Sequence, residues 1–176
     1  MTKSSMFTWT ILLVSLLNSA FSDDVPSASQ AAVQKHPVTL SAAKLQAAAL
    51  HEAMHSALRV THDRFYREDE GLPIPAATLK EVFADLKQKQ NITLRWLVVE
   101  GQAMNTDHVA QDDFEREAVA ALKSGRPHLD KVQDGIYRRA GPITLSNHCL
   151  KCHVPDRRST DDRTAGLLIS IPIQQP

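Results

Sequence analysis

The sequence predicts an α+β fold with an antiparallel sheet. The predicted elements run in the order two helices, a strand, a helix and at least two strands, rather than in regular strand–helix alternation. The 176 residues suffice for one domain. Apolar residues make up 43% of the chain, as in globular proteins, whereas aromatic residues make up only 5%. A large bound apolar group would help to fill such a core.

The first 22 residues have the pattern of a secretory signal peptide. Lys3 precedes an uncharged apolar run over residues 7–17, which is shorter than the roughly twenty residues that span a bilayer. Small residues, Ala20 and Ser22, stand at the positions that a signal peptidase reads. We expect cleavage after Ser22, no stable membrane span afterwards, and a periplasmic or secreted protein. An uncleaved anchor is the alternative.

The mature chain begins with a predicted flexible leader over residues 23–40, rich in Ser, Ala, Gln and Pro. Residues 41–176 are expected to form the single folded domain. The segment 41–68 is Ala-rich, contains neither Gly nor Pro and begins with Ser41, so it predicts a long helix. Its apolar stripe consists of Ala47, Leu50, Met54, Leu58, Thr61 and Phe65.

Two shorter helices are predicted further along. Residues 76–89 have apolar side chains at helical spacing, and Pro75 suits the first turn. Asp112 and Glu115 make a capping-box pattern that begins another helix, which ends at Gly125.

Three segments predict strands. Residues 92–100 are β-branched and aromatic. Residues 134–145 are strand-like, with an interruption expected at the Gly-Pro pair 141–142. Residues 166–173 form the last predicted strand, in which Pro172 indicates an edge position or the end of the strand.

Both cysteines of the chain lie in one motif, Cys149-Leu150-Lys151-Cys152-His153. This is the C-x-x-C-H pattern of c-type haem attachment. The two thiols add across the porphyrin vinyl groups, and the His that follows is held beneath the iron as its proximal ligand. We therefore predict one covalent haem c on Cys149 and Cys152, with His153 bound to iron. Export fits this prediction, because haem c is attached outside the cytoplasm.

Other uses of the two cysteines remain as alternatives. A thiol–disulfide oxidoreductase site usually follows a strand in a βαβ order, which is not predicted here. A zinc site could combine Cys149 and Cys152 with two histidines. A structural disulfide would be strained by the short spacing. The formal net charge is zero, which argues against a nucleic-acid binder, and no acid–base or nucleophile arrangement predicts an enzyme.

Three segments carry a resemblance to a known family. Residues 137–143 (YRRAGPI), the haem motif six residues later and residues 165–173 (AGLLISIPI) resemble the periplasmic single-haem-c domain with a PAS-like fold. That family, formerly a domain of unknown function, is also found as the sensor part of membrane histidine kinases. Residues 104–115 are similar to a looser version of its Asn-Pro…Asn…Pro-Asp-x-Trp-Glu stretch. The resemblance covers about residues 41–173.

The resemblance implies a PAS-like antiparallel sheet packed against a long N-terminal helical segment, with haem c between them. It further implies redox or small-ligand sensing, or periplasmic electron transfer. We expect sensing first, with electron transfer as the alternative, and an unidentified redox or signalling protein as partner. Family members can offer a Cys from the first helical segment as the second axial ligand, but this chain has no third Cys.

A histidine is the commonest substitute for such a ligand, and Met is the next. His51, His55 and His62 fall on one side of the first predicted helix. We expect His62 to bind iron, because Asp63 beside it can orient its ring. His55, Met54, Met104 and an open position are the alternatives. The remaining histidines are expected to be solvated or hydrogen-bonded rather than bound to iron: His36, His108, His128 and His148.

Haem propionates need positive partners. Arg138 and Arg139 precede the attachment motif, and Arg157, Arg158 and Arg163 follow it. We expect Arg138 and Arg139 in particular to form bidentate contacts with the propionates.

Overall fold

The computed structural model describes residues 37–103, 105–154 and 158–175. The predicted signal peptide, nearly all of the predicted leader, Met104 and Arg157 lie outside these residues. Within them, no helix is both long and apolar enough to cross a bilayer.

Four strands form one sheet in the order β1-β4-β3-β2, and all neighbours are antiparallel. The α+β prediction is therefore confirmed. The helices are α1 (Leu40–Phe65), α2 (Pro75–Gln90), α3 (Asp113–Lys123) and α4 (Asn147–His153); the strands are β1 (Thr93–Val98), β2 (Leu129–Gln133), β3 (Ile136–Leu145) and β4 (Arg163–Pro172); and the short 3-10 helices are η1 (Glu68–Glu70) and η2 (Thr106–His108).

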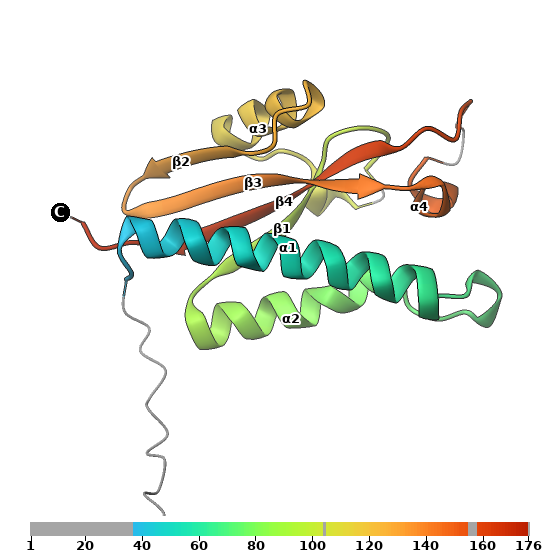
Figure 1. Ribbon diagram of the computed structural model, residues 1–176, viewed down its shortest axis with the longest axis horizontal. Helices are drawn as coiled ribbons and strands as arrows, with labels where there is room; N and C mark the ends of the chain where they lie inside the picture. Colours follow the sequence, from blue (N-terminus) through green and yellow to red (C-terminus); the bar gives the residue numbers. More distant parts are fainter. Residues whose placement is uncertain (1–36, 104, 155–157, 176) are drawn as a thin grey trace, which may run out of the picture. The chain divides into compact units, whose positions relative to one another are not determined.

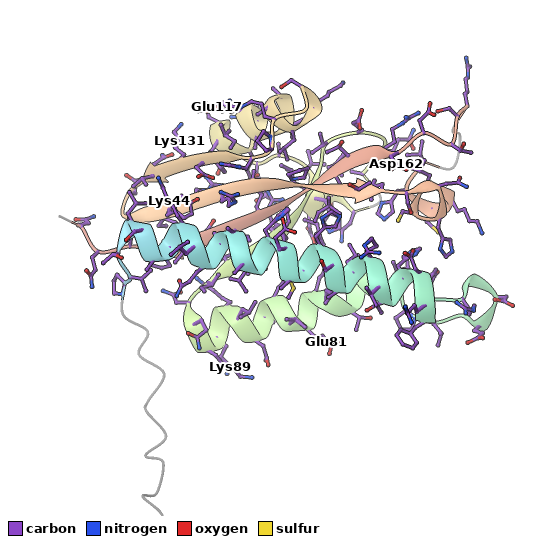
Figure 2. All side chains as sticks on the ribbon, in the orientation of Figure 1. Lys44, Glu81, Lys89, Glu117, Lys131 and Asp162 are labelled. Atoms are coloured by element: carbon purple, nitrogen blue, oxygen red, sulfur yellow. The ribbon has the colours of Figure 1, made fainter. Side chains whose placement is uncertain are left out.

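Helices cover both faces of the sheet (Figure 1). Helices α1 and α2 pack on one face and α3 on the other, while α4 follows β3 directly. The alternation of side chains along β4 separates the two cores. Leu167 and Ile169 pack toward α1 and α2, and Leu168 packs toward α3. Exposed charges of both signs, such as those of Lys44 and Glu81, cover the outer faces of the helices (Figure 2).

Small residues let α1 approach the sheet closely. Ala43 and Ala47 are completely buried beneath it. One turn further, the His51 ring lies against Gly141 of β3, where an added Cβ would come within 2.5 Å of two ring atoms. A glycine at this position therefore allows the helix to cross the strand. The N-cap of α1 is Thr39, whose side chain accepts a hydrogen bond from the Ala42 N–H, rather than the expected Ser41.

Three details of the sequence interpretation were wrong. Residues 141–142 do not interrupt β3, which pairs with β4 along its whole length. Strand β2 was missed; it joins β3 through Asp134 and Gly135, both with positive φ. The apolar stripe of the first helix ends near Leu58, since Phe65 is 68% exposed. Pro172 stands at the end of β4, one of the two positions expected for it.

Candidate functional site

The C-x-x-C-H motif forms the short helix α4, which was not predicted from the sequence. Residues three and four positions apart lie on the same side of a helix, so Cys149, Cys152 and His153 share one face. Both thiols are free and partly buried. Cys149 Sγ lies 3.5 Å from Oγ of Ser146, which precedes the helix, and Leu150 is completely buried and anchors it. The fold thus presents two thiols and one imidazole together.

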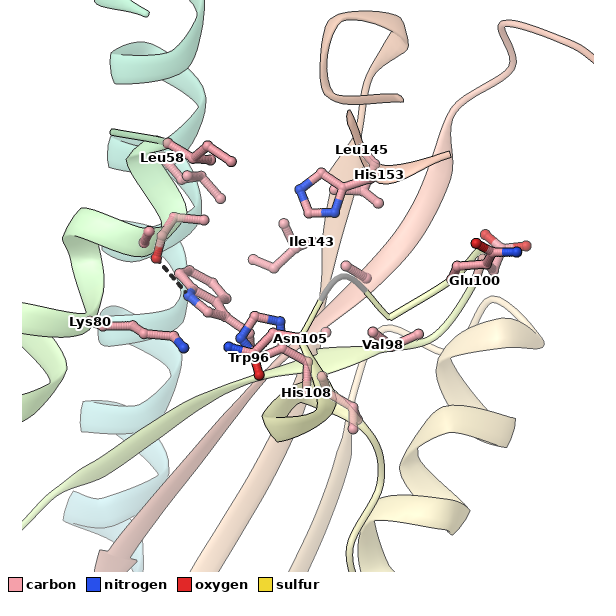
Figure 3. A pocket seen from close by; sticks show the side chains of 17 residues that line it. Leu58, Lys80, Trp96, Val98, Glu100, Asn105, His108, Ile143, Leu145 and His153 are labelled. Carbon is pink, nitrogen blue, oxygen red and sulfur yellow. Dashed lines mark hydrogen bonds between the residues drawn. The ribbon is translucent and has the colours of Figure 1, made fainter. Parts of the chain in front are cut away.

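A cavity of about 270 Å³ lies beside this face, between α1, α2 and the sheet (Figure 3). His153 stands on its wall, and much of the rest is apolar, including Leu58 of α1 and Ile143 of β3. Trp96 of β1 contributes a broad ring surface. Its Nε1 donates a hydrogen bond of 3.0 Å to the carbonyl oxygen of Ala76. This bond ties β1 to α2 at the cavity wall.

A smaller cavity of about 100 Å³ adjoins the larger one. His153 and Cys149 line it from α4, and His55, His62 and Asp63 line it from α1. Residues common to both cavities are Leu58, Ile74, Ala76, Leu145 and His153. His153 therefore stands where the two cavities meet.

The environment of His153 favours the form that binds metals. Burial lowers the pKa of this imidazole below its usual value of 6.5. The ring is therefore neutral at pH 7, and a neutral imidazole nitrogen has the lone pair that a metal ion requires.

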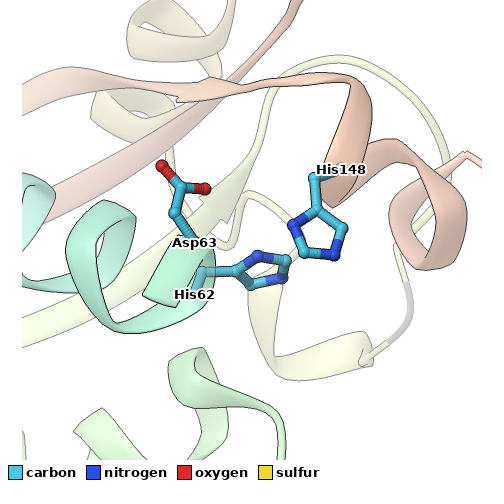
Figure 4. Close-up of side chains that lie close together, drawn as sticks. All are labelled: His62, Asp63 and His148. Atoms are coloured by element: carbon cyan, nitrogen blue, oxygen red, sulfur yellow. The ribbon is translucent and has the colours of Figure 1, made fainter. Parts of the chain in front are cut away.

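The structure brings His62, the predicted second axial ligand, to the smaller cavity. Its ring centroid lies 4.6 Å from that of His148, which immediately precedes Cys149 (Figure 4). Side-chain ligand atoms of His62, Asp63 and His148 all lie within 4.8 Å of one another. The end of α1 thus contacts the start of α4. Coordination of iron by His62 stays a prediction.

The alternatives to His62 have different surroundings. His55 also lines the smaller cavity, where its Nε2 accepts a hydrogen bond of 3.3 Å from the Thr144 N–H. Its lone pair is therefore already engaged with β3. Met54 packs against the core between α1 and the sheet. His51 is buried against Gly141 and lines neither cavity.

The two arginines predicted to bind propionates lie away from both cavities. Arg138 donates to Asp112 at 2.6 Å and stacks over the Phe114 ring on the α3 face of the sheet. Arg139 reaches across to Asp130 of β2 at 3.2 Å. Alternation along β3 directs Arg138 to the face opposite the cavities, and Arg139 has a carboxylate partner on the neighbouring strand. Propionate binding by either arginine stays a prediction. Arg158 and Arg163 line neither cavity either.

Five polar residues of the larger cavity were missed as candidates: Lys80, Glu100, Gln102, Asn105 and His108. Lys80 comes from α2, while Asn105 and His108 come from the segment around η2. Lys80 lies four positions after Ala76, which also lines the cavity, so helical spacing indicates that the two residues share one face of α2. His108 was expected to be solvated or hydrogen-bonded, and its approach to this cavity depends on the path of a loop.

A buried charge network supports that loop from the α3 side. Glu115 is only 4% exposed and lies between the guanidinium groups of Arg95 and Arg138. It accepts a bond of 3.1 Å from Arg138 and pairs closely with Arg95. It also accepts a bond of 2.6 Å from the backbone N–H of Gln111, between η2 and α3. The network links β1, β3 and α3 to the loop.

Comparisons with known proteins found a matching family and a similar solved structure. A family model described as Tll0287-like matches residues 34–166. Among solved structures, the crystal structure of the cyanobacterial haem protein Tll0287 matches with a TM-score of 0.57 and 14% sequence identity. The match covers 74% of this chain and 96% of that one. No curated protein matches. At this identity, the structural match establishes a shared fold.

Proposed function

This chain belongs to the Tll0287-like family, and from that premise we propose that it is an exported haem-binding protein with one covalently attached haem c. The observation that carries the proposal is the arrangement of α4. Its two free thiols and the imidazole of His153 share one face, from which Cys149 lines the smaller cavity and His153 lines both. The thiols would form the thioether links, and His153 would be the proximal ligand.

The surroundings suit a large apolar ring. The joined cavities, about 270 and 100 Å³, reach the lower end of the roughly 300–1,000 Å³ of small-molecule sites. Leu58, Trp96, Ile143 and Leu145 offer apolar surface to the faces of a porphyrin. Bound haem would supply an iron that takes up and releases one electron. The protein would hold this iron, exclude water from it and set its ligands.

We assign the protein to redox or small-ligand sensing, with electron transfer as the alternative, and regard it as a binding protein rather than an enzyme. The signal pattern over residues 1–22 supports a periplasmic or secreted location. The signal or electron would pass to a separate protein partner.

The second axial position distinguishes these roles. His62 is the ligand proposed here, because it lines the smaller cavity together with Cys149 and His153. A closed His62–His153 pair would give low-spin iron, with a lower reduction potential than a His/Met pair. Such iron suits redox sensing or electron transfer, whereas an open position suits binding of a gas.

The proposal is tested by visible spectroscopy of protein matured in a periplasmic expression system. The wild type should show a c-type haem spectrum and low-spin ferrous iron. His62→Ala should convert the ferrous iron to high spin and speed carbon monoxide binding. His128→Ala is the matched control, because His128 lies outside both cavities. An unchanged spin state in His62→Ala would remove His62 as ligand. A colourless wild type with a redox-active Cys149–Cys152 pair would instead favour a thiol oxidoreductase.

A further inference from the structure

The larger cavity differs in character between its two ends (Figure 3). Beside the His153 ring lie the apolar side chains of Ile143 and Leu145. Gln102 and Glu100 also line the cavity, and the Glu100 carboxylate accepts a hydrogen bond from the Thr164 N–H. At the other end, Lys80, Asn105 and His108 converge near Trp96. A molecule that fills this cavity should therefore be apolar at one end and carry polar groups at the other.

The polar end has unused capacity for hydrogen bonding. Nε2 of His108 is buried and has no hydrogen-bond partner among the described residues. Leaving a buried polar atom unsatisfied is unfavourable, so such an atom usually meets a ligand or water. Lys80 forms no ion pair with any carboxylate in the described part of the chain. Together these groups supply a positive charge and hydrogen-bond donors.

Hydrogen bonds from neighbouring residues fix the position of His108. Asn105 begins η2 by accepting a hydrogen bond of 2.9 Å from the Asp107 N–H. Arg95 then donates to the carbonyl oxygens of Asp107 and Val109, at 2.5 and 3.2 Å. These two carbonyls flank His108 in the chain. The buried network of Arg95 and Glu115 thus holds this imidazole against the cavity.

We propose that Lys80, Asn105 and His108 form the site that binds the haem propionates. Carboxylates are the groups that an ammonium, an imidazole N–H and an amide N–H recognise together. The apolar end at His153 would hold the iron and the macrocycle, and the polar end would orient the group. This assignment replaces the arginines expected from the sequence and rests on the proposed function, since it requires attached haem.

Resonance Raman spectroscopy of the matured holoprotein tests the site, because the propionate-bending bands report hydrogen bonds to the carboxylates. Lys80→Met and His108→Leu should each shift these bands while leaving the spin state unchanged. Lys80→Met should also lower the reduction potential, because a positive charge near the propionates stabilises ferrous iron. The controls are Lys87→Met, on the same helix but bonded to Asn91, and His128→Leu. Lys80→Gln and His108→Gln replace any variant that fails to mature.

Each result decides the question. Unshifted bands in both variants, with haem fully attached, would overturn the propionate site and leave the proposed function standing. A change of spin state in Lys80→Met or His108→Leu would also overturn it, because the residue would then be an iron ligand. A wild type without covalent haem would overturn both proposals.

Discussion

Glu115 should contribute more to stability than the two other carboxylates of α3, those of Asp113 and Glu117, because it alone of the three is buried. Its side chain is 6% exposed and joins Arg95, Arg138 and the Gln111 N–H. Replacing Glu115 by Ala leaves two guanidinium groups with one fewer acceptor and removes the acceptor of the Gln111 N–H. Breaking a buried ion pair costs about 3–5 kcal/mol. Both arginines keep other acceptors, so we expect about 3 kcal/mol.

Urea denaturation of the holoprotein at pH 7, followed by far-ultraviolet circular dichroism, measures this loss. Glu117→Ala is the matched control on the same helix. Its carboxylate is 58% exposed and lies 3.7 Å from Lys131, a pair worth less than about 1 kcal/mol. If Glu115→Ala unfolds within about 1 kcal/mol of the wild type, the buried network does not stabilise the loop and the reasoning fails.

Two further predictions concern the packing of α1 and the dependence of stability on pH. Gly141→Ala should lower the free energy of unfolding by about 1–3 kcal/mol, because the new Cβ meets the His51 ring. Adding His51→Ala to the same chain should recover part of this loss. A double-mutant cycle in which the two effects are independent would contradict the contact. Burial lowers the pKa values of His55, His108 and His153 below 6.5. In haem-free protein below pH 6.5, the unfolded chain therefore binds more protons than the folded chain. The free energy of unfolding should fall from pH 7.5 to pH 5.5. Equal or greater stability at pH 5.5 would refute this prediction.

Features encoded by neighbouring residues were predicted well. Asp112 caps α3 as predicted, since its side chain accepts a 2.9 Å hydrogen bond from the Glu115 N–H. The Glu115 carboxylate accepts from the Gln111 N–H rather than from the Asp112 N–H of a complete capping box. The helices near 76–89 and after Asp112 were also correct, because their apolar spacing and end signals are local. The C-x-x-C-H motif could be recognised for the same reason, because its five residues are consecutive. Haem attachment to it stays a prediction.

Features that depend on distant contacts were not predictable from local pattern. Strand β2 has little apolar alternation, and its pairing with β3 gives it structure. The direction of Arg138 depends on the register of β3, and a shift by one residue would reverse it. Lys80 and His108 are far apart in the chain and meet only because α2 and η2 border the same cavity. The polar end of the cavity that these two residues form can therefore be recognised only in the folded structure.

The proposed function depends on covalent attachment of haem through Cys149 and Cys152. Intact-mass spectrometry after acid-acetone extraction tests it most directly, because extraction removes haem that is not covalently bound. Protein matured in the periplasm should retain the added mass of one haem. The Cys149→Ala, Cys152→Ala double variant should retain none, and each single variant should keep one thioether link or lose the group. A wild type that loses all its haem on extraction would contradict the account.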